Sequence, residues 1–226
     1  MEPYTKADLA YRLLRRAIVV GEISGNEPLD EVALVGRFGT GRTPMREALK
    51  RLAQEQFIVW SPRRSPFVRD LSLQELLRLY ESRMVMEVPA ARLAATRVNA
   101  AQLAEIQRKG DQLREAADAG DVYRSIEADH ALHIAITRGS DNRFLTEAVD
   151  RLNCGSLRQW YIAHERLGLE MVPDQHQEII DALRTRDAEA VESAVRAHIV
   201  VSLKRQLKLN FGDVDNNIVD SIASVG

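Results

Sequence analysis

Apolar residues recur every three or four positions along most of this 226-residue chain, a spacing that places them on one face of a helix. In the first 70 residues this spacing predicts three helices, over 6–20, 30–38 and 43–54. Gly21 is placed to end the first helix, and the turn 39–41 separates the second from the third. The order helix, turn, helix indicates a helix-turn-helix unit.

The remainder of the chain, from Ser72 onward, shows helical spacing and no strand candidate of any length. Six helices are predicted there, over 72–97, 99–118, 121–138, 141–165, 173–186 and 187–209. The expected fold is mainly α, with an N-terminal domain at 1–70 and an all-α helical bundle at 71–209. We expect residues 210–226 to form a loosely held tail extension. Its larger apolar residues could dock on a partner subunit: Ile218, Val219 and Ile222.

Charge is distributed unevenly between these two regions. Residues 1–70 carry 12 Lys+Arg against 9 Asp+Glu, and the remainder carries 19 against 24, for a net charge of −2. A mildly basic domain beside an acidic one suits contact with nucleic acid. No apolar run approaches the roughly 18 residues of a membrane span, and no signal-peptide pattern opens the chain. Because Cys154 is the single cysteine, we expect a cytoplasmic protein in which it is a small packing residue.

The third predicted helix has one apolar and one basic side. Its core stripe recurs at helical spacing: Met45, Ala48, Leu49 and Leu52. Thr43 is expected to cap the helix with its hydroxyl, and Pro44 fits the first helical position. Arg42, Arg46 and Lys50 give the helix start a basic side that the major groove of DNA can admit. The alternative is a solvated amphipathic helix whose arginines have no specific role.

A hairpin is predicted directly after this helix, because two β-prone runs, 57–60 and 67–69, flank a turn-rich segment. Its tip carries Arg63 and Arg64. A hairpin attached to a helix-turn-helix is a wing, and tip arginines can reach phosphates or a narrow minor groove. The alternative is a solvated loop tip.

The run Arg42–Leu49, Arg-Thr-Pro-Met-Arg-Glu-Ala-Leu, resembles the winged helix-turn-helix signature of GntR-family bacterial transcription regulators. The resemblance implies that Arg42 and Arg46 contact the DNA operator, with Thr43 nearby and the wing tip in the minor groove. We expect a dimer that presents two winged heads to a pseudo-palindromic operator, since protein symmetry is mirrored in the site.

Lys50 and Arg64 complete the expected set of DNA-contacting residues. Two positions depart from the family pattern. Gly41 stands where the family usually has serine, which removes a candidate phosphate contact. Ser65 stands where the family usually has glycine after the wing arginine, which alters the fit of the wing.

Four polar residues lie within the apolar stripes of three helices in the second region. Asp129 and His133 share one face of the 121–138 helix, and His176 and His198 lie on the apolar faces of the last two. A single histidine on such a face is usually a hydrogen-bonded core residue. Three imidazoles and a carboxylate that face one interior favour a shared metal ion, because an isolated buried carboxylate is costly.

The donor set suits Zn, Ni, Cu, Mn or Fe and does not choose among them, with zinc as the first candidate. His130 points about 100° away from Asp129 around the helix and is therefore left out of the set. His164 lies near a predicted helix end and is interpreted as a surface or cap residue.

The spacing Asp129-x3-His133 with His176 and His198 resembles the metal-binding form of the FadR C-terminal (FCD) domain in the FadR branch of that family. The resemblance implies an all-helical bundle that holds a metal ion with a small organic acid above it. It implies that these four residues are the metal ligands. Six helices indicate the VanR-like subgroup.

The resemblance also implies that Arg83 faces the effector cavity and pairs with an effector carboxylate. The alternative partner of Arg83 is Glu87, four residues later on the same helix. The two interpretations stay open.

The leading hypothesis is a DNA-binding transcription regulator and homodimer controlled by an organic acid at a metal site. A metal-dependent, hydrolase-like enzyme with a nucleic-acid-binding head is the alternative, although no general base and no Ser/His/Asp or Cys/His arrangement stands out. A third interpretation is a winged-helix protein-interaction module. The sequence does not distinguish a repressor from an activator.

Overall fold

A computed structural model describes residues 5–61, 63–169, 172–212 and 216–225. The chain divides into two compact units, Met1–Asp70 with Cys154–Arg158, and Leu71–Asn153 with Gln159–Gly226. We refer to 1–70 as the head and to 71–226 as the body. None of the helices in the described ranges is both long and apolar enough to cross a membrane.

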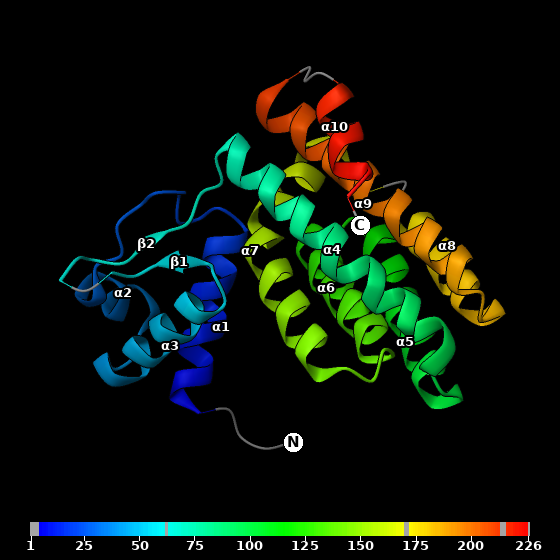
Figure 1. The fold of residues 1–226 in the computed structure, drawn as a ribbon. Coiled ribbons are helices and arrows are strands. Elements are labelled where there is room, and N and C mark those ends of the chain that lie inside the picture. The colour runs from blue at the N-terminus through cyan, green and yellow to red at the C-terminus, as the bar shows by residue number, and fades with distance from the viewer. Residues whose placement is uncertain (1–4, 62, 170–171, 213–215, 226) are drawn as a thin grey trace. The chain divides into compact units, whose positions relative to one another are not determined.

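In its described residues, 5–61 and 63–70, the head contains three helices and a two-stranded hairpin (Figure 1). The elements are α1 (Lys6–Val19), α2 (Glu31–Phe38), α3 (Arg42–Gln54), β1 (Ile58–Val59) and β2 (Phe67–Val68). The strands are antiparallel, with Ile58 opposite Val68. Gly39 ends α2 in the left-handed conformation, φ 62°, and so makes the tight turn before α3. The predicted winged helix-turn-helix is therefore confirmed.

The expected cap of α3 is wrong. Gly41 is the N-cap residue, the helix begins at Arg42, and no side chain caps it. The first intrahelical bond runs from Met45 N to Gly41 O. Pro44 therefore occupies the third helical position, which is tolerated because the first four N–H groups of a helix have no intrahelical partner. Thr43 is left exposed on the first turn.

The predicted core stripe of α3 is confirmed, and α1 packs against it. The buried apolar side chains of the head are Ala10, Leu14, Ala17, Ile18, Val19, Ile23, Leu29, Leu34, Met45, Ala48, Leu49, Leu52, Phe57, Ile58 and Val68. Because α3 buries this face, its opposite, basic side is the one left in solvent.

In the described residues the body contains seven helices. They are α4 (Leu73–Arg97), α5 (Ala100–Asp118), α6 (Val122–Arg138), α7 (Arg143–Leu167), α8 (Val172–Thr185), α9 (Ala188–Phe211) and α10 (Asn216–Ala223). The six predicted helices are confirmed to within two residues at each end. Ser72 caps α4 with Glu75 in a reciprocal capping box, as its sequence predicts.

Helix α4 packs along α9, α5 along α6, and α8 against both α5 and α9. This arrangement brings the inner faces of α4, α6, α8 and α9 around one core (Figure 1). That core is mainly apolar, and the polar residues of the next section are among the few that enter it.

The expectation of a loosely held tail is wrong. α10 packs against α4 and α9, and its Val219 and Ile222 are buried in the body's core. Arg196 Nη1 donates to the carbonyls of Ala223 (3.0 Å) and Val225 (2.8 Å), which ties down the end of α10. Val219 and Ile222 lie three residues apart on one helical face, and this face of α10 packs on the body of its own chain. The VanR-like assignment rested on six helices, and α10 makes a seventh.

Candidate metal centre and DNA interface

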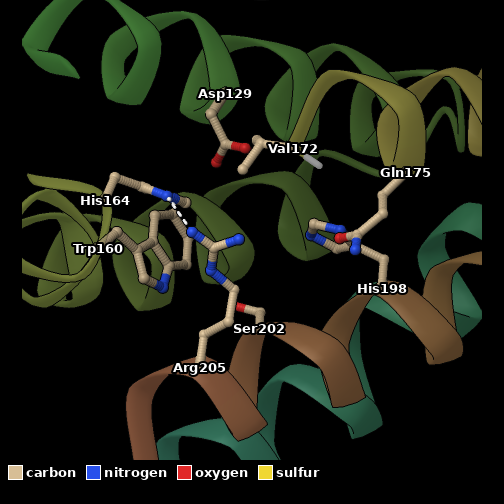
Figure 2. A pocket seen from close by; sticks show the side chains of 8 residues that line it. All are labelled: Asp129, Trp160, His164, Val172, Gln175, His198, Ser202 and Arg205. Atoms are coloured by element: carbon tan, nitrogen blue, oxygen red, sulfur yellow. Dashed lines mark hydrogen bonds between the residues drawn. The ribbon is translucent and has the colours of Figure 1, made fainter. Parts of the chain in front are cut away.

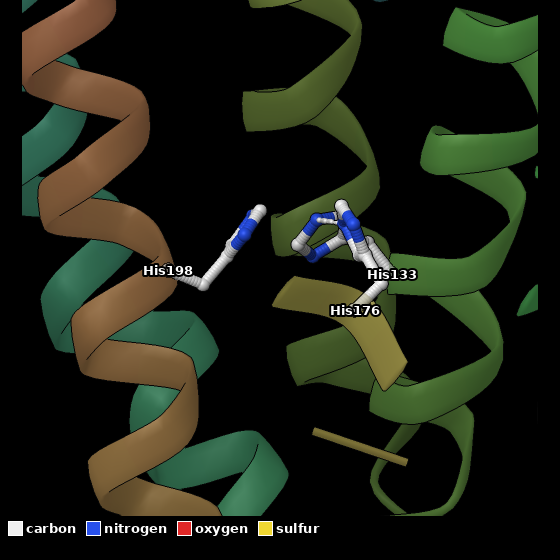
Figure 3. A group of neighbouring side chains, drawn as sticks. All are labelled: His133, His176 and His198. Atoms are coloured by element: carbon white, nitrogen blue, oxygen red, sulfur yellow. Dashed lines mark hydrogen bonds between the residues drawn. The ribbon is translucent and has the colours of Figure 1, made fainter. Parts of the chain in front are cut away.

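Three histidine side chains from three helices meet inside the body. His133 comes from α6, His176 from α8 and His198 from α9, and each is at most 8% exposed. One ring nitrogen from each lies within 4.8 Å of the others. Figure 3 shows the three rings turned toward one another. The sequence-predicted histidines are therefore brought together.

Asp129 joins this cluster from one turn earlier in α6. Its Oδ1 lies 2.9 Å from His176 Nε2, and its Oδ2 lies 3.9 Å from His133 Nε2. Burial alone raises the pKa of Asp129, but the neighbouring histidines outweigh it, so the pKa lies well below its usual value. The carboxylate is therefore ionised and can act as a ligand.

Hydrogen bonds on the outer side of two rings orient these histidines. His133 Nδ1 lies 3.1 Å from Glu87 Oε2, and His176 Nδ1 lies 2.7 Å from the Val172 carbonyl. Both rings thus turn Nε2 toward the cluster, where the two Nε2 atoms are 3.2 Å apart. Metal-binding histidines characteristically donate their other N–H to a carboxylate or a carbonyl.

His198 has no such partner. Its Nδ1 is buried and makes no hydrogen bond within the described residues. Burial lowers the pKa of His198 well below its usual value, and the nearby His176 and His133 lower it further. A neutral ring with an unsatisfied buried nitrogen beside an ionised carboxylate and two oriented imidazoles fits a divalent metal ion.

Arg83 is fully buried and is connected to the cluster through Glu87, which contacts His133. Its Nε donates to Glu87 Oε1 at 2.6 Å and its Nη2 to Oε2 at 3.3 Å, so the ion pair considered from the sequence is present. The guanidinium also lies over the rings of Trp160 (4.8 Å) and Tyr80 (5.1 Å). Its Nη1 has no hydrogen-bond partner in the described part of the chain.

Glu87 is the site residue that the sequence reasoning missed, since it was considered only as a partner of Arg83. It is 3% exposed. Burial alone raises its pKa, but Arg83 and His133 outweigh it and lower the pKa to about 2. The only sequence signal was a carboxylate in the apolar segment 84–88 of α4.

A small cavity of about 30 Å³ adjoins the cluster (Figure 2). Its lining comes from α6, α7, α8 and α9: Asp129, Trp160, His164, Val172, Gln175, His198, Ser202 and Arg205. Arg83 is not among the lining residues. His164 lies in the last turn of α7, as predicted, and is partly exposed, but its side chain also lines this cavity. Burial lowers the pKa of His164 to about 4.

His130 lies outside the cluster, as predicted, and its Nε2 contacts Asp150 Oδ1 at 2.9 Å. Cys154 is buried in α7, in keeping with a packing role.

In the head, every residue expected to contact DNA is exposed: Arg42, Thr43, Arg46, Lys50 and Arg64. The first four belong to the first nine residues of α3, and Arg64 lies at the tip of the wing. Arg63, next to it, adopts a positive φ of 64° in the turn. This geometry leaves a basic helix start and a basic wing tip available to a nucleic acid.

Comparison with known proteins assigns each part of the chain. Residues 6–68 match the family of bacterial regulatory proteins called gntR, and residues 78–200 match the FCD domain. The chain is 30% identical to the HTH-type transcriptional repressor RspR of Escherichia coli over 84% of its own length and 83% of that protein. It is 26% identical to a probable D-xylose utilization operon transcriptional repressor of Paenarthrobacter nicotinovorans, over 86% of each chain.

Two solved structures share the fold. E. coli McbR/YncC aligns with a TM-score of 0.75 at 22% identity, over 90% of this chain and 99% of that one. A GntR regulator from Rhodococcus sp. RHA1 aligns with a TM-score of 0.72 at 20% identity, over 91% of this chain and 99% of that one. The matched domains are DNA-binding and regulatory, and the relatives are named as transcription regulators, so the enzyme hypothesis is not supported. The chain belongs to the GntR family of bacterial transcription regulators, with an FCD domain as its helical body.

Proposed function

We propose that this regulator changes its affinity for a DNA operator when a divalent metal ion and a small organic acid bind in its body. The observation that carries the proposal is the convergence of three buried imidazoles and one buried carboxylate. Burying four such groups together is costly unless a common ligand satisfies them.

Asp129, His133, His176 and His198 would hold the metal ion. Zinc is the first candidate, and Ni, Mn, Fe or Cu would also accept nitrogen and oxygen donors. When bound, the ion supplies a positive charge that attracts an acid's carboxylate. The Asp129 carboxylate and the neutral His198 ring are in the protonation states that metal binding needs. Burial lowers the pKa of His176, but Asp129 outweighs it and raises that pKa, so His176 would release a proton when the ion binds.

The acid would lie in the adjoining cavity, which at about 30 Å³ has room for only one or two water molecules and would have to widen to admit it. Ser202, Gln175 and Arg205 line it with hydrogen-bonding groups from α8 and α9. Arg83 does not line this cavity, but its Nη1 is a buried donor with no hydrogen bond to another described residue, so it would pair with an effector carboxylate only if the acid extended past the lining residues. Because the cavity joins four helices, occupying it can bias how α7, α8 and α9 pack.

In the head, Arg42, Thr43 and Arg46 would read or position the operator, while Lys50 and Arg64 would add contacts to DNA. We propose that a homodimer presents two heads to a pseudo-palindromic operator. The relatives named as repressors favour repression as the outcome.

Selection of bound sequences from a random DNA library would supply the operator. Elemental analysis of the purified protein would identify its metal, and operator affinity would then be titrated with and without added acids. Sequence-selective binding that shifts with acid supports the proposal. Binding that lacks sequence preference, or a protein that takes up no divalent metal, contradicts it.

A further inference from the structure

We infer that Glu87 is a positioning residue for the metal centre, because it holds the His133 ring in place and ties it to Arg83. The inference rests on the proposed metal-binding function and adds to it a residue outside the ligand set. Glu87 itself would not bind the ion, since its carboxylate is engaged by Arg83 on one side and His133 on the other.

The geometry forms a continuous chain across two helices. Arg83 and Glu87 lie one turn apart in α4, and the carboxylate contacts the guanidinium through both oxygens. The same Oε2 then lies 3.1 Å from His133 Nδ1 in α6. Nε2 of that ring points to Asp129 and His176. The Glu87 contact is thus on the side of the ring opposite the cluster.

The chemical consequence concerns the tautomer of His133. An ionised carboxylate only accepts hydrogen bonds, so the nitrogen that faces Glu87 must carry the proton. Nε2 then holds the lone pair that a metal ion needs. Without this acceptor, the proton of the neutral ring could reside on Nε2 instead of Nδ1, or the ring could rotate about its side-chain bonds. Either change would remove the Nε2 lone pair from the cluster.

The other two histidines do not share this dependence. His176 is oriented by the Val172 backbone carbonyl, which no side-chain substitution deletes. His198 Nδ1 has no hydrogen-bond partner in the described residues. Among the described contacts of the cluster, the His133–Glu87 contact is therefore the one through which a side chain outside the ligand set orients a ligand.

Arg83 explains how the carboxylate can be buried there. A lone buried charge would be strongly unfavourable, whereas a paired and hydrogen-bonded one is tolerated. Substituting Glu87 alone would leave Arg83 unpaired and could prevent folding. A neutral double variant avoids that problem, because it removes both charges together.

The test compares two double variants, Arg83→Met with Glu87→Leu and Arg83→Met with Glu87→Gln. Glutamine keeps an oxygen that can accept from His133 Nδ1, and leucine does not. Zn²⁺ affinity is measured by competition with a chromophoric chelator. The tautomer of His133 in metal-free protein is read by ¹⁵N-detected NMR. Glu192→Gln, in the exposed ion pair with Arg92, is the matched control.

We expect the leucine variant to bind Zn²⁺ about 10–100-fold more weakly and to lose the Nδ1–H tautomer, with the glutamine variant recovering part of both. If the leucine variant does not fold, Glu87→Asp, which keeps the charge and shortens the reach to His133, is expected to weaken Zn²⁺ binding as well. Unchanged Zn²⁺ affinity and tautomer in the folded variants overturn the role of Glu87 while the metal site stands. Unsubstituted protein that binds no Zn²⁺ or other divalent metal overturns the proposed function and this inference together.

Discussion

Nε of Arg46 in α3 lies 3.4 Å from Oε1 of Glu31 in the first turn of α2. The Arg46 side chain is 62% exposed, so solvent screens the pair and it contributes little to stability. A guanidinium has five N–H donors, and the contact through Nε does not engage those on Nη1 and Nη2. The exposed side chain therefore remains able to bind a base edge.

Replacing Arg46 should weaken specific DNA binding. Arg46→Ala is expected to cost about 1–3 kcal/mol for the selected operator, because a bidentate contact to a base edge is lost. Fluorescence anisotropy at fixed salt measures the change. Arg108→Ala, an exposed arginine of α5, is the control. Unchanged affinity in Arg46→Ala would remove this residue from the DNA-contact set.

Removing the carboxylate that contacts Arg46 should strengthen DNA binding instead. Glu31→Gln is expected to tighten binding to operator and random DNA alike by about 0.2–1 kcal/mol, since a negative charge near the phosphates is lost. Anisotropy titrations at several salt concentrations measure the gain, which should shrink as salt rises. Weaker operator binding by this variant would instead show that Glu31 holds Arg46 in its reading position.

The metal site should depend on His176. His176→Ala is expected to lose bound metal without unfolding the chain, because it removes the imidazole closest to Asp129. Elemental analysis gives the metal content and circular dichroism the helicity. Asp181→Ala, an exposed residue of α8 outside the cluster, should keep its metal. Full metal content in His176→Ala would refute the site assignment.

Helix α10 should contribute to the stability of the body. Ile222→Ala is expected to lower the free energy of unfolding by about 2–4 kcal/mol, because it empties part of the core. Thermal or urea denaturation measures the loss, with the exposed Asp220→Ala as the control. A loss no larger than that of the control would mean that α10 does not dock in solution.

The head should lose stability at alkaline pH through Tyr11. Burial, with the hydrogen bond from Tyr11 Oη to Glu55 Oε2 at 2.6 Å, raises the pKa of Tyr11 above its usual value. A raised folded-state pKa gives stability that is present below the unfolded pKa of about 10 and is lost as pH rises above it. Urea unfolding at neutral and alkaline pH should therefore show a steeper loss in the unsubstituted protein than in Tyr11→Phe. Equal losses would contradict this assignment.

The helices were predictable because each buries a stripe long enough to show its period. The start of α3 was not, since Pro44 fits any position in the first turn and Gly41, which caps through its backbone, gives no side-chain signal. α10 was missed because eight residues with two buried apolar side chains make too short a pattern.

The site residues that stand out within the sequence of a single helix were predictable. Asp129 and His133 stand out because polar residues on an apolar face need partners. The contact between Glu87 and His133 joins α4 to α6, and the approach of Trp160 and His164 brings in α7. Such pairings depend on how the helices are arranged in space, which hydrophobic periodicity does not contain.

The central claim is that ligands in the body control the affinity of the head for DNA. The most direct measurement is anisotropy of a labelled operator, titrated with protein that is metal-loaded or stripped, in the presence of lactate, malate or citrate. We predict that one such acid changes the operator Kd at least about fivefold in metal-loaded protein. The His176→Ala variant should still bind the operator and show no response to the acid. An equal response in that variant, or no response to any small acid in metal-loaded protein, would contradict the account.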